Sequence, residues 1–240
     1  MEYESVFNII DNHRTIRKYK KMSIPSQHMD MIIKAGLRAP SSANLQSYGI
    51  IRIIDTQLRE KIAYLAGEQE HIIESSEFLL FYADLYRLKK CLELMGGTIY
   101  QPNFMMLYVA TIDASLAAQN IVIMAEALGY GTCYIGGIQN NPCEIASLLN
   151  LPKYCYPLFG LTIGTPDENP ERRFRLSEKV IVSINYYDRD KPYKAIKEYS
   201  QRNVYESFKR RLNRYISKEG RLNKRYNIFR ECLHKMGIEV

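Results

Sequence analysis

The chain has 240 residues, of which 46% are hydrophobic and 25% charged, and its formal net charge is +7. This length suits one large domain or two small ones. The balanced composition excludes collagen-like, fully disordered and multi-pass membrane proteins.

The predicted elements mix helices and strands along the whole chain. In chain order, apolar spacing and β-branched runs predict helices near 6–10 and 26–39, a strand at 49–55, a helix at 56–65, a strand at 77–84, helices at 85–95 and 109–128, a strand at 132–135, a helix at 142–149, and strands at 156–163 and 180–185. From Pro192 the pattern predicts helix, interrupted at Gly220. There is no regular βαβ repeat, which favours an α+β layer architecture over a doubly wound fold.

The predicted helix at 109–128 is apolar on nearly all sides. Such a helix must be buried on most sides, so we expect it at the centre of the fold, where it can also form a subunit interface. We find no uncharged apolar stretch long enough to span a bilayer, and the acidic N-terminus does not resemble a secretory signal.

Positive charge is concentrated at the C-terminal end of the chain. Residues 188–240 hold 15 Lys and Arg against 7 Asp and Glu, a balance of +8, whereas residues 1–187 carry a balance of −1. A basic block of this kind is typical of binding to nucleic acid, a membrane surface or a small polyanion, and equally of a solvated helical face. We expect a domain over 1–187 and a basic helical extension over 188–240, packed on the domain or on a partner subunit.

The five cysteines favour reduced thiols. Their number is odd and no two have C-x-x-C spacing, so a zinc site or a disulfide framework is not expected. Reduced, buried thiols are typical of a cytoplasmic protein, and we expect that location.

Two segments rich in arginine are candidates for binding an anion. His13, Arg14, Thr15 and Arg17 follow the first helix, and Arg172, Arg173 and Arg175 lie between predicted strands. Guanidinium groups offer paired donors that suit phosphate, although either segment also reads as a solvated basic turn.

Two loops offer polar or backbone groups to a flat ligand. The loop Ser41–Gln46 presents hydroxyls and N–H groups, and Gly136 and Gly137 at a strand end permit close backbone approach. Both features also occur in ordinary turns.

Known catalytic motifs are missing. The sequence has no G-x-x-x-x-G-K-[ST], G-x-G-x-x-G, G-x-S-x-G or H-E-x-x-H pattern and no evident metal-ligand cluster. An enzyme without these motifs can rely on a bound cofactor to carry out the chemistry.

Taken together, the segments resemble the nitroreductase family of FMN enzymes, in its NADPH-dependent oxygen-insensitive nitroreductase and flavin reductase branch. The resemblance spans about residues 5–187 and rests on an ordered set of loose motifs. They are His13–Arg17, Arg38–Gln46, Gly67–His71, Asp113–Asn120, Ala125–Gly131, Tyr134–Gly137 and Leu158–Gly164.

The resemblance implies a three-layer α/β/α fold with a mostly antiparallel central sheet, and an intertwined homodimer with FMN at the subunit interface. By position, the residues expected to bind the cofactor are His13, Arg14, Thr15, Ile16, Arg17, Ser41 from the partner subunit, Gln69, Tyr134, Ile135, Gly136, Gly137, Arg173 and Arg175. Ser42, Gln139, Arg225 and Tyr226 are expected near the substrate. The family branch usually has Lys at the position of Arg173 and often has Arg where Gln139 stands.

The implied activity is ping-pong hydride transfer from NADPH or NADH through FMN to nitroaromatics, quinones or free flavin. No protein nucleophile is required, in agreement with the missing motifs, and we expect neither a metal nor a membrane partner. The alternative is a nucleic-acid-binding protein that uses residues 188–240. It predicts affinity that falls steeply with salt and a colourless protein.

Overall fold

The computed structural model describes residues 2–98 and 101–239, and the chain divides into two compact units. The first unit comprises Met1–Glu171 and Ile228–Val240, and the second comprises Arg172–Asn227. The chain returns from the second unit to the first within helix α11 (Arg221–Lys235). The expected division into a cofactor-binding domain over 1–187 and a basic extension over 188–240 stays a prediction.

An antiparallel sheet forms the centre of the first unit. Its strands are β1 (Tyr48–Arg52), β2 (Glu77–Asp84), β3 (Gly131–Ile135) and β4 (Cys155–Gly164), in the order β1-β2-β4-β3. The longest pairing joins β2 to β4, from Glu77 opposite Ile163 to Asp84 opposite Cys155. A shift in the register next to Phe81 inserts one residue into β4.

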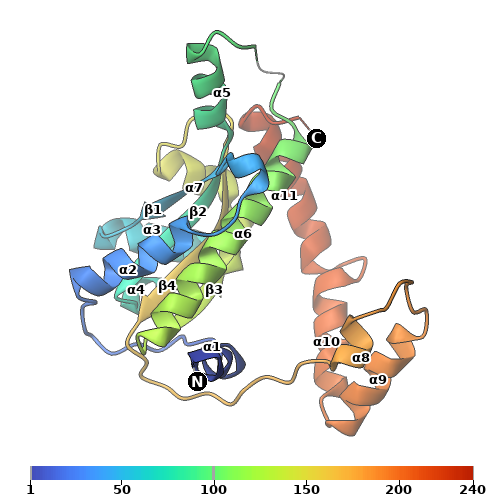
Figure 1. Cartoon of the computed structure of the whole chain (residues 1–240). Coiled ribbons are helices and arrows are strands. Elements are labelled where there is room, and N and C mark those ends of the chain that lie inside the picture. The colour runs from blue at the N-terminus through green and yellow to red at the C-terminus, as the bar shows by residue number, and fades with distance from the viewer. Residues whose placement is uncertain (1, 99–100, 240) are drawn as a thin grey trace. The chain divides into compact units, whose positions relative to one another are not determined.

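Helices cover both faces of this sheet (Figure 1). One face packs against α2 (Ser26–Leu37) and α6 (Phe104–Ala127). The other packs against α3 (Thr56–Leu65), α4 (His71–Glu74) and α7 (Pro142–Leu148). The sheet between two helical layers confirms the expected α+β class and the mostly antiparallel sheet.

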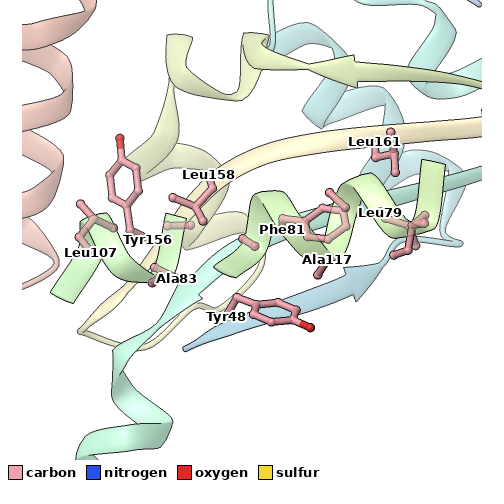
Figure 2. Close-up of a cluster of buried hydrophobic side chains, with 14 of the residues drawn as sticks. Tyr48, Leu79, Phe81, Ala83, Leu107, Ala117, Tyr156, Leu158 and Leu161 are labelled. Carbon is pink, nitrogen blue, oxygen red and sulfur yellow. The ribbon is translucent and has the colours of Figure 1, made fainter. Parts of the chain in front are cut away.

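Strand β2 has apolar side chains on both sides because it lies inside the sheet. Leu79 and Phe81 point into the cluster beneath α6, whereas Phe78 and Leu80 belong to the cluster beneath α3. Figure 2 shows the first cluster, with Phe81 beside Ala117 of α6. Burial on two faces explains why this strand reads as a continuous apolar run.

Helix α6 confirms the expected central helix. Ala114, Ala117 and Ala118 are fully buried, and these small side chains allow close packing. At Gly36 of α2, an added Cβ would lie 2.7 Å from the side chain of Ile121, so the two helices approach too closely for a larger residue. By length and composition α6 could also cross a membrane, but a helix buried in a protein core can have the same length and composition.

The remaining elements of the first unit are short. They are α1 (Glu2–Asp11), α5 (Leu85–Leu94) and the 3₁₀ turns η1 (Ser42–Asn44) and η2 (Gly136–Asn140).

The second unit is helical, and the strand predicted at 180–185 is wrong. The unit holds α8 (Glu178–Ile181), α9 (Lys191–Gln201), α10 (Tyr205–Ile216) and the first part of α11. Arg172–Asn227 is described throughout and contains no strand. A β-branched run needs a neighbouring strand to satisfy its backbone, and without one Val182 and Ile184 remain exposed outside regular structure.

The expectation that all five cysteines are reduced is also wrong. Cys143 of α7 and Cys232 of α11 form a disulfide across 89 positions of sequence, with their Cα atoms 5.4 Å apart. That separation lies within the range a disulfide requires, and only the tertiary fold creates it. The other three cysteines form no disulfide: Cys133 and Cys155 are buried and Cys91 is exposed.

Candidate functional site

The segment at residues 13–20 runs along one end of the sheet and is fastened on two sides. Thr15 forms a parallel bridge with Thr132, and the Ile16 N–H donates to the Thr132 carbonyl at 2.9 Å. On the other side, the Lys20 N–H donates to the Thr165 carbonyl at 2.9 Å. The buried Tyr19 hydroxyl lies 2.7 Å from the Ile16 carbonyl. These bonds hold the two arginines of the segment on a rigid backbone.

His13 is engaged within the protein. Its Nδ1 lies 2.7 Å from Oε1 of Glu126, which also accepts a bond from the Thr132 hydroxyl at 3.0 Å. His13 therefore joins the end of α6 to this segment, and its second ring nitrogen is the group available to a ligand.

Arg14 carries a buried donor without a protein acceptor. One terminal nitrogen donates to Oδ1 of Asn169, whereas the buried Nε has no hydrogen-bond partner among the described residues. A buried donor without an acceptor is costly, so an acceptor beside the Nε of this half-buried side chain would be strongly favoured. Arg14 lines a cavity of about 510 Å³ together with Ile16, Tyr130 and Asn169.

Arg17 and Gln69 meet at a second, larger cavity of about 1080 Å³, which His71 also lines. The Arg17 N–H donates to Oε1 of Glu168 at 2.5 Å, and the Gln69 N–H donates to the Ala63 carbonyl at 3.1 Å. The fold thus brings together an arginine and a glutamine that lie 52 positions apart in sequence. Both were expected to bind the cofactor.

The surroundings of His71 favour its neutral form. Burial, and then the positive charge of Arg17, lower the pKa of His71 below its ordinary value of 6.5, against a smaller opposing effect of Glu168. Its Nε2 lies 3.8 Å from Sγ of the buried Cys133. The large cavity therefore places the Arg17 cation near an imidazole whose neutral form is favoured, and Lys18, Lys20 and Lys21 also line it.

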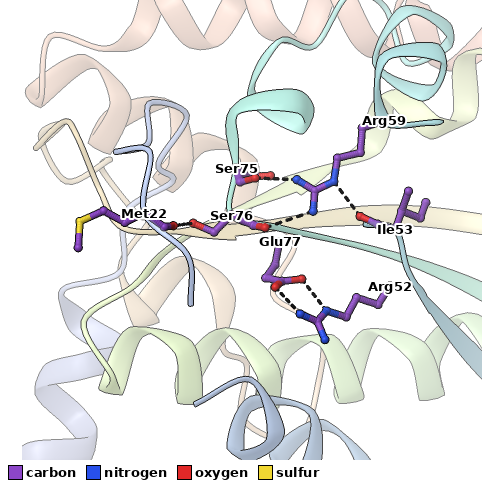
Figure 3. Close-up of polar contacts among 7 residues, drawn as sticks. All are labelled: Met22, Arg52, Ile53, Arg59, Ser75, Ser76 and Glu77. Atoms are coloured by element: carbon purple, nitrogen blue, oxygen red, sulfur yellow. Dashed lines mark hydrogen bonds and ion pairs between the residues drawn. The ribbon is translucent and has the colours of Figure 1, made fainter. Parts of the chain in front are cut away.

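The wall of the large cavity is braced by a buried arginine. Ser75 and Ser76 line the cavity, and Figure 3 shows both carbonyls bound to the guanidinium of Arg59. Arg59 Nε donates to the Ile53 carbonyl at 2.7 Å. Beside it, Arg52 Nε donates to Glu77 at 2.7 Å.

The strand end at residues 134–137 combines a close contact with an open position. At Gly137 an added Cβ would lie 2.2 Å from the Ala66 carbonyl oxygen, so glycine is required there. At Gly136 an added Cβ would meet nothing within 4 Å. Ile135 is buried, and Tyr134, 40% exposed, packs its ring edge against Phe159. Burial, then Glu126, raises the pKa of the Tyr134 hydroxyl to about 12.

The loop at residues 41–47 is anchored on helix α6. The Ser42 N–H donates to one oxygen of Asp113 at 3.0 Å, and the Ser47 hydroxyl donates to the other at 2.8 Å. The Ser41 hydroxyl accepts from the Gln46 N–H at 3.3 Å. Ser42 is exposed, and Ser41 is partly so.

Gln139 is turned into the protein. Its Nε2 donates to the carbonyls of Pro157 and Leu158 at 2.8 and 2.7 Å, and its Oε1 accepts from the Tyr156 hydroxyl at 2.7 Å. A substrate that bound this amide would have to replace these bonds.

Four expected site residues belong to the second unit. Arg173 and Arg175 are exposed, Tyr226 is 51% exposed, and burial with the nearby Arg221 lowers the pKa of Arg225. The expected convergence of Arg173 and Arg175 with Arg14 on one phosphate stays a prediction. So does the substrate contact expected of Arg225 and Tyr226.

The sequence interpretation missed the acids and amides that position these groups. Asp113 accepts a hydrogen bond from the loop at residues 41–47, and Glu126, Glu168 and Asn169 pair with the segment at residues 13–20. Asp113 and Glu126 lie within the motifs Asp113–Asn120 and Ala125–Gly131 but were given no role, and Glu168 and Asn169 belong to no motif. Among residues 2–98 and 101–239, no three His, Cys, Asp or Glu side chains gather to hold a metal ion.

Comparisons with known proteins identify the family of this chain. A model of the Nitroreductase family matches residues 10–165. An NADPH-dependent oxidoreductase of Staphylococcus saprophyticus is 35% identical over 219 residues, covering 89% of this chain and 84% of its own. The oxygen-insensitive NADPH nitroreductase of Salmonella typhimurium is 38% identical over 180 residues, covering 75% and 73%. The solved NADPH:FMN oxidoreductase of Vibrio harveyi, in complex with NAD+, superposes with a TM-score of 0.84 at 29% identity, covering 98% of each chain.

Proposed function

The chain belongs to the nitroreductase family, and on this premise we propose that it is an FMN-dependent oxidoreductase that reduces small acceptors with electrons from NADPH or NADH. The acceptor class is nitroaromatics, quinones or free flavin. FMN held by these residues would supply ping-pong hydride transfer from the nicotinamide to the acceptor. The protein's own residues bind and orient the cofactor and the acceptor, and their charges polarise the reacting groups.

The unmet Nε of Arg14 is the observation that carries this proposal. A phosphate oxygen is the acceptor that a guanidinium fork suits best, so Arg14 holds the phosphate of the cofactor. Thr15 and the free ring nitrogen of His13 flank it on the same segment. We assign Arg173 and Arg175 to complete this phosphate site.

The opposite end of the cofactor belongs to the large cavity. Arg17 and Gln69 bind the pyrimidine edge of the ring, where the fixed charge of Arg17 stabilises negative charge that develops on reduction. The open position at Gly136 leaves room for a flat ring beside the strand end. Tyr134, Ile135 and Gly137 complete that side, and Ile16 is assigned to the same cofactor site.

A homodimer is part of the proposal. Tyr108, Ile112 and Leu116 stand on successive turns of α6 and are 41–52% exposed, and an apolar stripe of this kind favours burial against a second copy. The loop that carries Ser41 then reaches the cofactor of the partner subunit, and Ser42 lies near the acceptor. Gln139, Arg225 and Tyr226 are assigned to the acceptor side.

A cytoplasmic location also belongs to the proposal. The disulfide between Cys143 and Cys232 removes the support that cysteine usage lent to it, because disulfides are rare in reducing compartments.

Titration of the purified protein with FMN tests the function. We expect a flavin absorbance spectrum and a Kd for FMN that rises about 10- to 100-fold in Arg14→Ala and in Arg17→Ala, since a hydrogen bond to a charged group contributes about 1.5–3 kcal/mol. Lys34→Ala, which removes an exposed cation from α2, is the matched control and leaves the Kd unchanged.

A colourless protein that FMN does not reconstitute contradicts the function. Two arginine variants that retain flavin as the parent does contradict the placement of the site. Steady-state kinetics with both nicotinamides across several acceptors then identifies the preferred pair.

A further inference from the structure

Asp113 is a buried carboxylate in the middle of α6. It is 1% exposed, and both of its oxygens are used. One oxygen accepts from the Ser42 N–H at 3.0 Å. The other accepts from the N–H and the hydroxyl of Ser47 at 3.3 and 2.8 Å. All three donors come from the two ends of a single loop.

The loop that these bonds close has an unfavourable backbone conformation. Ala43, Asn44 and Gln46 have φ angles of 48°, 57° and 51°, within the left-handed region that residues other than glycine avoid. Strain of this kind persists only where surrounding contacts impose it, and it gathers at functional sites. The strained residues are exposed, so burial of their own side chains does not impose it.

A carboxylate supplies what this loop requires. A charged acceptor forms stronger hydrogen bonds than a neutral one, and a buried carboxylate that lost its donors would be left uncompensated. The backbone of Ser42 and Ser47 is therefore held at fixed points on the rigid core helix, and the residues between them have one favoured path.

We propose that Asp113 is a positioning residue that holds the loop at residues 41–47 in its strained form and so presents Ser41 and Ser42 for binding. This inference rests on the proposed function, which assigns Ser41 to the cofactor and Ser42 to the acceptor side. Asp113 touches neither ligand and acts only through the loop.

The variant Asp113→Asn tests this role, because the amide keeps the shape but replaces one acceptor by a donor. Asn120→Ala is the matched control. Asn120 lies on the same helix, and its Nδ2 donates to the Ala35 carbonyl of α2 at 3.1 Å, away from the loop. Ser47→Ala removes one of the three donors and serves where Asp113→Asn does not fold.

Hydrogen exchange on flavin-free protein gives the first readout. We expect the amides of Ser42 and Ser47 to exchange about tenfold faster in Asp113→Asn and about threefold faster in Ser47→Ala, with no change in Asn120→Ala. FMN titration gives the second readout, with a Kd about tenfold higher in Asp113→Asn. At saturating FMN, the KM for the acceptor rises at least threefold while kcat stays within twofold.

Two results overturn the inference. One is unchanged exchange in the loop. The other is a faster loop with unaltered FMN affinity and acceptor KM, which would make Asp113 a stabilising residue of the core only. Failure of the proposed function is distinct, because the parent protein itself would then bind no FMN.

Discussion

The two units differ in how they are held together. The sheet of the first unit is buried on both faces, whereas α9 and α10 of the second unit contain no buried residue. Residues 172–227 hold 17 Lys and Arg against 6 Asp and Glu, so the remainder of the chain holds 16 against 20. The first unit thus has a buried core and a net negative charge, whereas the second unit is helical and basic and has few buried residues.

This difference shows where rigidity is available for binding. Every contact that positions Arg14, Arg17 and the loop at residues 41–47 lies in the first unit, where fixed donors and acceptors can be maintained. Low-burial elements open at low free energy, and elements that close on ligands are drawn from them. The second unit lies within the 89 positions between Cys143 and Cys232, two residues of the first unit that the disulfide joins.

Among the variants that test this difference between the units, the removal of Arg59 should change the free energy of unfolding most. Arg59→Met leaves the carbonyls of Ile53 and Ser75 without their donors, and we expect a loss of about 3–5 kcal/mol in the free energy of unfolding. Urea denaturation measures it. Lys61→Met, an exposed change on the same helix, should stay within about 0.5 kcal/mol. Equal losses in the two variants would show that the network in Figure 3 does not brace the first unit.

The aromatic stack of the second unit should give a smaller and local effect. Tyr199 stacks on Phe208 with centroids 3.8 Å apart and meets the edge of Phe174 at 5.6 Å. Tyr199→Ala should cost about 1–2 kcal/mol, since aromatic pairs contribute about 0.5–1.5 kcal/mol each beyond area burial. Amides of α9 and α10 should exchange about tenfold faster.

Tyr199→Ala also tests whether the two units unfold independently. Strand β2 should keep its exchange rates, and Tyr193→Ala, at a position 75% exposed on the same helix, should change neither region. Faster exchange in β2 would mean that the units unfold together and that the contrast between them is not energetic.

The sequence predicts local order better than long-range contact, and the strands show why. The runs at 77–84 and 180–185 have similar propensity, but only the first has neighbours to pair with. The family and the enzyme class were predictable because ordered motifs record the fold as a whole. The bonds of Asp113 and Glu126 were not, because each joins positions distant in sequence. The disulfide was not predicted for the same reason, because it joins two cysteines 89 positions apart.

Titration of His71 should give the smallest effect, and it tests the first unit alone. Burial and the charge of Arg17 lower the pKa of His71, so its neutral form is favoured in the folded protein. The corresponding stability is fully present above the unfolded pKa of about 6.5 and is lost as the pH falls through the lowered folded value. His71→Gln removes this titration. Because the ring is partly exposed and solvent screens it, we expect less than about 1 kcal/mol. Unfolding of flavin-free protein at pH 7.5 and pH 5.5 measures it. The parent should lose more stability on acidification than the variant does. An equal loss in both would place the imidazole in bulk solvent rather than against the wall of the large cavity.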